Sequence, residues 1–220
     1  MIRAILFDLD GTLADTALDL GGALNRLLAE EGRPPVPYER VRPIASHGAR
    51  GLVELGFGLG REAAGFDALR LRFLDHYEHC FCEQTTLFDE INPLLEALVK
   101  QGLDWGIITN KPMRFTDRLI PTLGFSVPPS VVVSGDTVGI AKPDPRPMRH
   151  ACDILGLPTE SCWYVGDAER DIMAGKAVGM TTVLADYGYI ADHDQPDSWG
   201  ADLRIATPME LLAHLSRLRV

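Results

Sequence analysis

The sequence lacks the features that mark membrane, secreted or zinc-binding proteins. No apolar run approaches the roughly 20 residues that a membrane-spanning helix needs. Because Met1-Ile2-Arg3 leads directly into a predicted strand, we expect no signal region. Only one residue separates Cys80 from Cys82, unlike common zinc pairs, and no partner pair follows at Cys152 and Cys162. We therefore expect a cytoplasmic protein with four reduced, mostly buried thiols.

An excess of basic residues is also lacking. The 220 residues include 21 Lys and Arg against 31 Asp and Glu, a formal net charge of −10. This balance argues against nucleic acid and against anionic membranes as partners. A small anionic substrate stays compatible, because a cation and a few basic side chains can reverse the field inside one pocket. With 46% hydrophobic residues, the chain can form one core and a small accessory domain.

The order of predicted elements indicates an α/β fold with a doubly wound parallel sheet. Apolar runs alternate with helical patterns along residues 86–220 and imply βαβ units with helices on both faces of the sheet. We expect strands at residues 4–7, 103–109, 131–133, 163–165, 181–184 and 203–205. We expect helices at residues 90–101, 113–123, 146–155, 171–178 and 208–217. Residues 1–15 and 86–220 are therefore predicted to form one core domain.

Residues 16–85 read differently and predict an all-helical insert. Apolar residues recur at helical spacing over residues 18–31 and 66–82, and no convincing strand lies between residues 38 and 84. The insert leaves the core just after the first strand and returns to the same edge of the sheet. We therefore expect a cap domain that is placed to act as a lid.

The most informative motif is FDLDGTLADT at residues 7–16. A buried strand delivers Asp8 and Asp10 to its carboxyl end, and Gly11 turns the chain. Two carboxylates this close repel each other unless a cation or a shared proton lies between them. A Mg²⁺ site follows, with one carboxylate as nucleophile and the other handling protons. The alternatives are a plain acidic turn or a calcium loop, but a calcium loop needs further oxygen ligands where Leu13 and Ala14 stand.

Three more polar clusters follow predicted strands or precede a helix. Thr109 opens the segment TNKP, whose hydroxyl and backbone N–H groups suit a phosphate oxygen. Lys142 opens the segment KPDP, whose two prolines restrict the backbone after it, and Asp167 and Asp171 belong to GDAERD. Asp167 suits a further Mg²⁺ carboxylate, whereas Asp171 suits orienting Lys142 or a metal-bound water. Each cluster alone is equally typical of a cap or a turn, but chance assembly of the ordered set is improbable.

This ordered set resembles the motifs of haloacid dehalogenase superfamily phosphatases with a helical cap. The resemblance runs over nearly the whole chain, through FDLDGTLADT, ITNKP, AKPDP and VGDAERD. It implies that Asp8 attacks phosphorus and forms an aspartyl-phosphate. It also implies that Asp10 protonates the leaving group and then activates water. Thr109 and Lys142 would bind the phosphoryl oxygens.

The same resemblance implies Mg²⁺ as the cofactor. Its ligands would be the Asp8 carboxylate, the Asp10 backbone carbonyl and Asp167, with Asp171 in support behind them. The charges of Mg²⁺ and of the lysine ammonium would offset the repulsion between a carboxylate and a phosphate dianion. One departure is Ala168, where a small hydroxyl residue is commoner in the family.

Substrate choice is expected to lie in the cap, around residues 42–51. Ser46, His47 and Arg50 lie in a segment that opens a helix, and they suit a carboxylate or a second anionic group. Asn110 is a further candidate substrate contact, and Arg114 and the YGY loop at residues 187–189 are weaker ones. A capped helix start with a solvated Arg50 is the structural alternative.

The chain resembles phosphoglycolate phosphatases and, equally, N-acetylmuramic acid 6-phosphate phosphatases. The second comparison draws on WGIITNKPMRF at residues 105–115 and on the YGYI and WGAD segments. We expect phosphoglycolate as substrate, with the amino-sugar phosphate as the alternative. Both carry a carboxylate, so pocket size rather than Arg50 separates them.

Other functions remain open at this point. A phosphomutase would share Asp8 and Asp10, and a pyrophosphatase or nucleotidase would share every catalytic residue. A non-catalytic binding protein predicts the loss of at least one motif residue, and none is lost. The expected partner is a small phosphorylated metabolite, with the protein as a monomer or homodimer.

Overall fold

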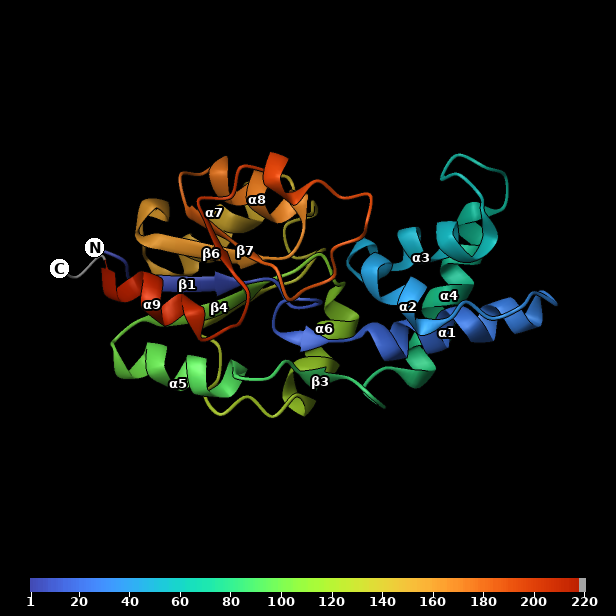
Figure 1. Ribbon diagram of the computed structural model, residues 1–220, viewed down its shortest axis with the longest axis horizontal. Helices are drawn as coiled ribbons and strands as arrows, with labels where there is room; N and C mark the ends of the chain where they lie inside the picture. The colour runs from blue at the N-terminus through green and yellow to red at the C-terminus, as the bar shows by residue number, and fades with distance from the viewer. Residues whose placement is uncertain (218–220) are drawn as a thin grey trace.

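A six-stranded parallel sheet forms the centre of the computed structural model, which describes residues 1–217 (Figure 1). Its order is β5-β4-β1-β6-β7-β8, so the first strand of the chain lies between two later ones. The strands are β1 (Ala4–Phe7), β4 (Asp104–Ile108), β5 (Val131–Val133), β6 (Cys162–Gly166), β7 (Thr181–Ala185) and β8 (Leu203–Ile205). The predicted doubly wound parallel sheet is confirmed.

Helices cover both faces of this sheet (Figure 1). On β1, Ala4 and Leu6 share one buried cluster with residues of α7 (Arg146–Leu155) and α8 (Glu169–Lys176). Its alternate residues Ile5 and Phe7 belong to the other cluster, with residues of α5 (Ile91–Lys100) and α9 (Glu210–Arg217). The twofold alternation of side chains along a strand thus buries β1 on both faces.

Several predicted helix boundaries differ by two residues or more, and two of the differences have local chemical reasons. The helix predicted at residues 171–178 begins at Glu169, because the Asp171 carboxylate accepts the Ala168 N–H at 3.0 Å and caps the helix start. The helix predicted at residues 113–123 ends as α6 (Met113–Leu119). Pro121 follows, and Ile120–Thr122 form a 3₁₀ turn instead.

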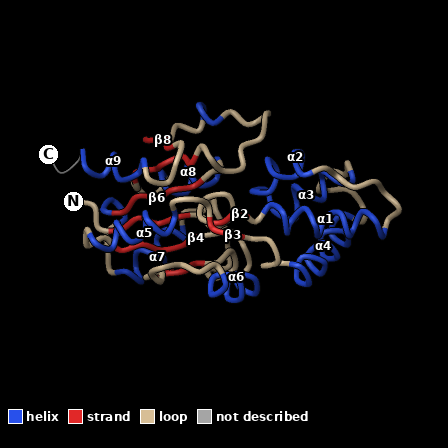
Figure 2. Tube along the Cα trace, turned by 60° about the horizontal axis from the view of Figure 1, so that its bottom comes forward, coloured by secondary structure: helices blue, strands red, loops and turns tan. Residues whose placement is uncertain are grey.

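The insert is helical, as predicted. It contains α1 (Ala17–Glu30), α2 (Tyr38–Val41), the 3₁₀ helix η1 (Arg42–His47), α3 (Gly48–Phe57) and α4 (Phe66–Cys80). These helices gather beyond the carboxyl end of the sheet (Figures 1 and 2). Leu24 of α1, Leu52 of α3 and Phe73 of α4 are fully buried among them. The division of the chain at residues 16 and 85 into two domains stays a prediction.

The connections into and out of the insert lie side by side. They pair as an antiparallel ribbon of β2 (Ala14–Asp15) and β3 (Thr86–Leu87), which the sequence did not predict. Two-residue strands are too short to give an alternating pattern. The buried carboxylate of Asp19 ties α1 to the returning connector, since it accepts the Gln84 N–H at 3.0 Å and the Thr85 hydroxyl at 2.6 Å.

None of the four cysteines is in a disulfide within the described residues; three are buried and Cys82 is half-buried, so the predicted burial is confirmed. Among residues 1–217, none of the helices combines the length and the apolar character that crossing a membrane requires.

We expect Asp19→Ala to lower the free energy of unfolding by about 2 kcal/mol, because it removes the buried acceptor of several hydrogen bonds from the partly buried connector. Urea unfolding followed by circular dichroism measures the change. Asp67→Ala is the matched control, since the Asp67 side chain is 85% exposed and its pair with Arg70 is worth about 0–1 kcal/mol. Equal effects of the two substitutions would contradict the proposed tie.

Candidate functional site

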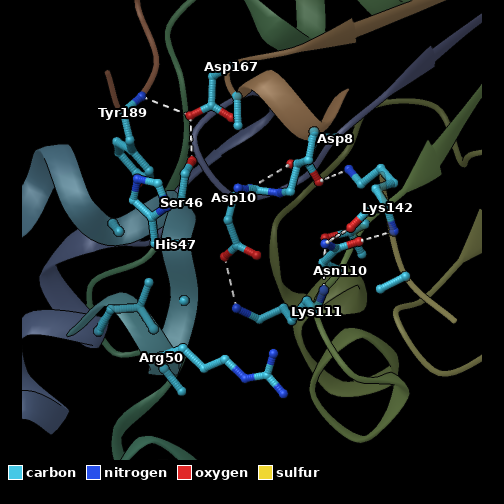
Figure 3. Close-up of a pocket in the computed structure, with 18 of the residues that line it drawn as sticks. Asp8, Asp10, Ser46, His47, Arg50, Asn110, Lys111, Lys142, Asp167 and Tyr189 are labelled. Atoms are coloured by element: carbon cyan, nitrogen blue, oxygen red, sulfur yellow. Dashed lines mark hydrogen bonds and ion pairs between the residues drawn. The ribbon is translucent and has the colours of Figure 1, made fainter. Parts of the chain in front are cut away.

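The ends of three neighbouring strands bring the sequence-predicted residues together (Figure 3). In the register of the sheet, Phe7 of β1 pairs with Ile107 of β4 and with Val165 of β6. Asp8, Thr109 and Asp167 follow these strands and therefore lie at one edge of the sheet. They line a cavity of about 660 Å³ whose opposite wall is formed by η1, α3 and α4.

Lys142 forms the buried centre of this edge. Its ammonium nitrogen Nζ lies 3.0 Å from Asp8 Oδ1 and 2.7 Å from Asp171 Oδ1. It also donates to the Ile108 carbonyl at 2.8 Å and to the Tyr164 hydroxyl at 2.7 Å. Asp171 therefore lies where it can orient the ammonium group. Four contacts leave this lysine little freedom, which suits a fixed positive charge beside Asp8.

Three buried carboxylates share the site. Ligand oxygens of Asp8, Asp167 and Asp171 all lie within 4.8 Å of one another. Burial, with the charges of Asp171 and Asp8, raises the pKa of Asp167 to about 7. Burial would raise the pKa of Asp8 too, but Lys142 and Arg170 hold it below 3.8. The donor set of hard oxygens and excess negative charge suits a divalent cation.

Close backbone packing and the cap hold Asp167 in place. Its Oδ2 accepts the Tyr189 N–H at 2.8 Å and the Ser46 hydroxyl at 2.6 Å. Gly11 has a φ of +85°, and a Cβ there would lie 2.1 Å from Asp167 Oδ2. Glycine is thus required where the first motif turns. The hydroxyl proton of Ser46, which the sequence assigned to substrate, is engaged by this carboxylate instead.

Asp10 is held by Lys111, whose role the sequence pattern did not predict. Its Oδ1 lies 2.8 Å from Lys111 Nζ and accepts the Thr16 hydroxyl at 2.7 Å. Lys111 also donates to the Tyr77 hydroxyl of α4 at 2.8 Å. Burial raises the pKa of Tyr77 to about 12, so its hydroxyl stays neutral. The cap thereby contacts the partner of Asp10 directly.

Asn110 connects two loops of the site rather than facing the cavity with a free amide. Its Nδ2 donates to the Lys142 carbonyl and its Oδ1 accepts the Lys142 N–H, both at 2.9 Å. The side chain thus positions Lys142, and its predicted contact with substrate would have to use atoms other than these. Thr109 is buried beside it and lines the cavity; its hydroxyl oxygen accepts the Lys111 N–H at 3.2 Å.

The cap side of the cavity presents His47 and Arg50 (Figure 3). Among residues 1–217, Arg50 has no carboxylate within ion-pair distance, whereas Arg61 and Arg70 pair with Glu54 and Asp67. Burial, with the nearby charge of Arg170, lowers the pKa of His47. In a chain of net charge −10, the cavity lining combines five acidic residues, Asp8, Asp10, Asp167, Glu169 and Asp194, with six cationic ones, Arg50, Arg61, Arg70, Lys111, Lys142 and Arg170. Such a lining suits an anionic ligand.

Comparison with known proteins agrees with this arrangement. The model of the family described as haloacid dehalogenase-like hydrolase matches residues 5–185. A crystal structure described as a predicted phosphoglycolate phosphatase from Haemophilus somnus superposes with a TM-score of 0.84 at 25% sequence identity. The match covers 97% of this chain and 98% of that one.

Two curated relatives are similar over most of their length. A Pseudomonas aeruginosa protein named N-acetylmuramic acid 6-phosphate phosphatase is 42% identical over 217 residues, covering 98% of this chain and 96% of that protein. A Xanthomonas campestris protein named phosphoglycolate phosphatase is 41% identical over 209 residues, covering 95% and 94%. Since the two identities are nearly equal, identity alone does not separate the two named activities.

The raised pKa of Asp167 predicts a pH-dependent cost to stability in the absence of divalent ions. The folded state prefers the protonated carboxyl, so stability is lost as the pH rises from the ordinary pKa of 3.8 to about 7. In EDTA, we expect Asp167→Asn to be more stable than the wild type by about 4 kcal/mol above pH 7 and by almost nothing at pH 4.

A pH series of urea unfolding curves measures this difference. Asp153→Asn serves as control, because Asp153 is exposed on α7 and its substitution removes the same charge. A stability difference for Asp167→Asn that does not change with pH would contradict the interpretation.

Proposed function

The chain belongs to the haloacid dehalogenase-like hydrolase family and is a phosphatase; we propose that it hydrolyses a sugar phosphate that bears a carboxylate, best represented by N-acetylmuramic acid 6-phosphate. The observation that carries this proposal is the cavity of about 660 Å³ at Asp8, whose lining includes six cationic residues. Pockets of this size bind ligands larger than a two-carbon acid.

Asp8 is proposed as the nucleophile. Its Oδ1 is engaged by Lys142 Nζ at 3.0 Å and by the Leu9 N–H at 2.8 Å. Among residues 1–217, no hydrogen bond engages Oδ2, so this oxygen is available to attack phosphorus. The new P–O bond forms as the ester P–O bond breaks, and Asp8 becomes an aspartyl-phosphate.

Asp10 is proposed as the general acid and base. It gives a proton to the departing alkoxide, and in the second step it takes a proton from the water that attacks phosphorus. The bond between Asp8 and phosphorus then breaks, which releases phosphate and restores the carboxylate. Thr16 and Lys111 fix Oδ1 of Asp10, and no hydrogen bond from the described residues occupies its Oδ2.

Mg²⁺ is proposed as the cofactor, held by the carboxylates of Asp8 and Asp167 and by the Asp10 carbonyl. The buried, like-charged carboxylates fit a small hard cation. When bound, the ion offsets the charge repulsion between carboxylate and phosphate. Hydrogen bonds from the Tyr189 N–H and the Ser46 hydroxyl hold the Asp167 carboxylate in position for this role.

Arg50 is proposed to bind the substrate carboxylate. It extends from α3 along the cavity wall without an acidic partner among the described residues. The neighbouring Ala45, Gly48 and Ala49 also line the cavity and leave room for a sugar ring. Phosphoglycolate is the second candidate, because a relative of that name is 41% identical over nearly the whole chain.

Phosphate release with Mg²⁺ and with EDTA is the test of the proposal. We expect kcat/KM for N-acetylmuramic acid 6-phosphate to exceed that for phosphoglycolate by about tenfold or more, since only the larger substrate fills the cavity. EDTA and Asp8→Asn should each abolish turnover. A preference for phosphoglycolate would reverse the substrate assignment, and phosphate release by Asp8→Asn would refute the mechanism. A phosphomutase would isomerise the sugar phosphate and release no phosphate.

Arg50→Ala should weaken carboxylate-bearing substrates selectively. We expect kcat/KM to fall about 10- to 100-fold for these substrates, and about threefold or less for p-nitrophenyl phosphate, because only the former lose a charge-assisted hydrogen bond. Arg40→Ala is the matched control, being an exposed cap arginine outside the cavity. Equal losses on both kinds of substrate would remove Arg50 from the recognition of the carboxylate.

A further inference from the structure

Arg170 is a largely buried guanidinium whose donors are unused. It lies in the first turn of α8, between Glu169 and Asp171, and lines the cavity. Its side chain is only 18% exposed, and its Nε is buried without a hydrogen-bond partner. Its Nη2 lies 3.7 Å from Asp8 Oδ2, which is too long for a hydrogen bond. Buried donors of this kind normally have a hydrogen-bond partner, so the missing partner of Arg170 requires an explanation.

Each of the surrounding carboxylates has at least one other partner. Lys142 forms ion pairs with Asp8 Oδ1 and Asp171 Oδ1, and Asp167 Oδ2 accepts the Ser46 hydroxyl and the Tyr189 N–H. These acids stabilise the charge of Arg170 at a distance, and they raise its pKa against the opposing effect of burial. The guanidinium is therefore held in place as a cation, yet its N–H groups remain available.

Arg170 lines the cavity together with the nucleophile and with residues of the cap. It approaches the one oxygen of Asp8 that is free of hydrogen bonds from the described residues, Oδ2. His47 of η1 lines the same cavity, and burial together with the charge of Arg170 lowers the pKa of its imidazole. A group attacked by Asp8 Oδ2 would occupy this same space. The planar fork of arginine can donate two parallel hydrogen bonds to the oxygens of a phosphoryl group.

We propose that Arg170 is a catalytic residue that binds the non-bridging oxygens of the phosphoryl group while Asp8 attacks it. The inference rests on the proposed function in one respect, that Asp8 is the nucleophile. During transfer, negative charge spreads over three equatorial oxygens. Lys142 already pairs with Asp8 and Asp171 in the structure, so Arg170 adds donors to those expected from Lys142. Because Arg170 acts on the phosphoryl group, its contribution is the same for every leaving group.

Arg170→Gln tests this role, with p-nitrophenyl phosphate and N-acetylmuramic acid 6-phosphate as substrates and orthovanadate as a mimic of the transferring phosphoryl group. We expect kcat/KM to fall about 10²- to 10³-fold on both substrates alike. The inhibition constant of vanadate should rise about tenfold or more. Arg170→Lys keeps the charge but not the planar guanidinium, so its kcat/KM and its vanadate inhibition should lie between those of the wild type and of Arg170→Gln. Arg149→Gln, on the exposed surface of α7, is the control for the lost charge.

Activity and vanadate inhibition of Arg170→Gln within about threefold of the wild type would overturn the inference. A loss of activity with unchanged vanadate inhibition and an altered Mg²⁺ requirement would also overturn it, since Arg170 would then act only on the acidic residues. Melting temperatures show whether each variant folds, and Arg170→Lys carries the test if Arg170→Gln does not. If the wild type releases no phosphate, or Asp8→Asn still does, the proposed function fails instead.

Discussion

The concentration of negative charge at one buried edge of the sheet is the constraint on which the rest of the structure depends. Three carboxylates, of Asp8, Asp167 and Asp171, lie within 4.8 Å of one another away from water. Lys142 offsets part of this charge, and its contacts with the Ile108 carbonyl and the Tyr164 hydroxyl anchor it to two strands. The parallel register that aligns the strand ends is therefore also what brings opposite charges within reach of each other.

The cap contributes to this balance as well as to the wall of the cavity. Ser46 donates to Asp167, and Tyr77 accepts from the lysine that holds Asp10. Arg42 donates to the carbonyls of Tyr187 and Gly188, in the loop whose next N–H binds Asp167. Helices that the sequence connects with substrate choice thus also position the groups proposed for the chemistry.

The features predicted well from the sequence are those that depend on local pattern. Apolar runs located the core strands, and polar residues directly after them located Asp8, Thr109 and Asp167. The side-chain partners could not be predicted, because they join segments far apart in the chain. Asn110 binds the backbone at Lys142, 32 residues away, and Ser46 binds a carboxylate 121 residues away. The roles of Lys111 and Arg170 likewise depend on contacts with residues far away in the sequence, which only the folded structure brings near.

The short ribbon of β2 and β3 restricts how the two parts of the molecule can move. The outgoing and returning connectors are paired at Ala14 with Leu87 and at Asp15 with Thr86. Strands joined by a ladder cannot bend independently without breaking its hydrogen bonds. A movement of α1–α4 away from the sheet would therefore bend both connectors together, as a hinge motion about a single axis. Two unpaired connectors would also allow the helices to slide or twist relative to the sheet, and this pairing opposes such movements.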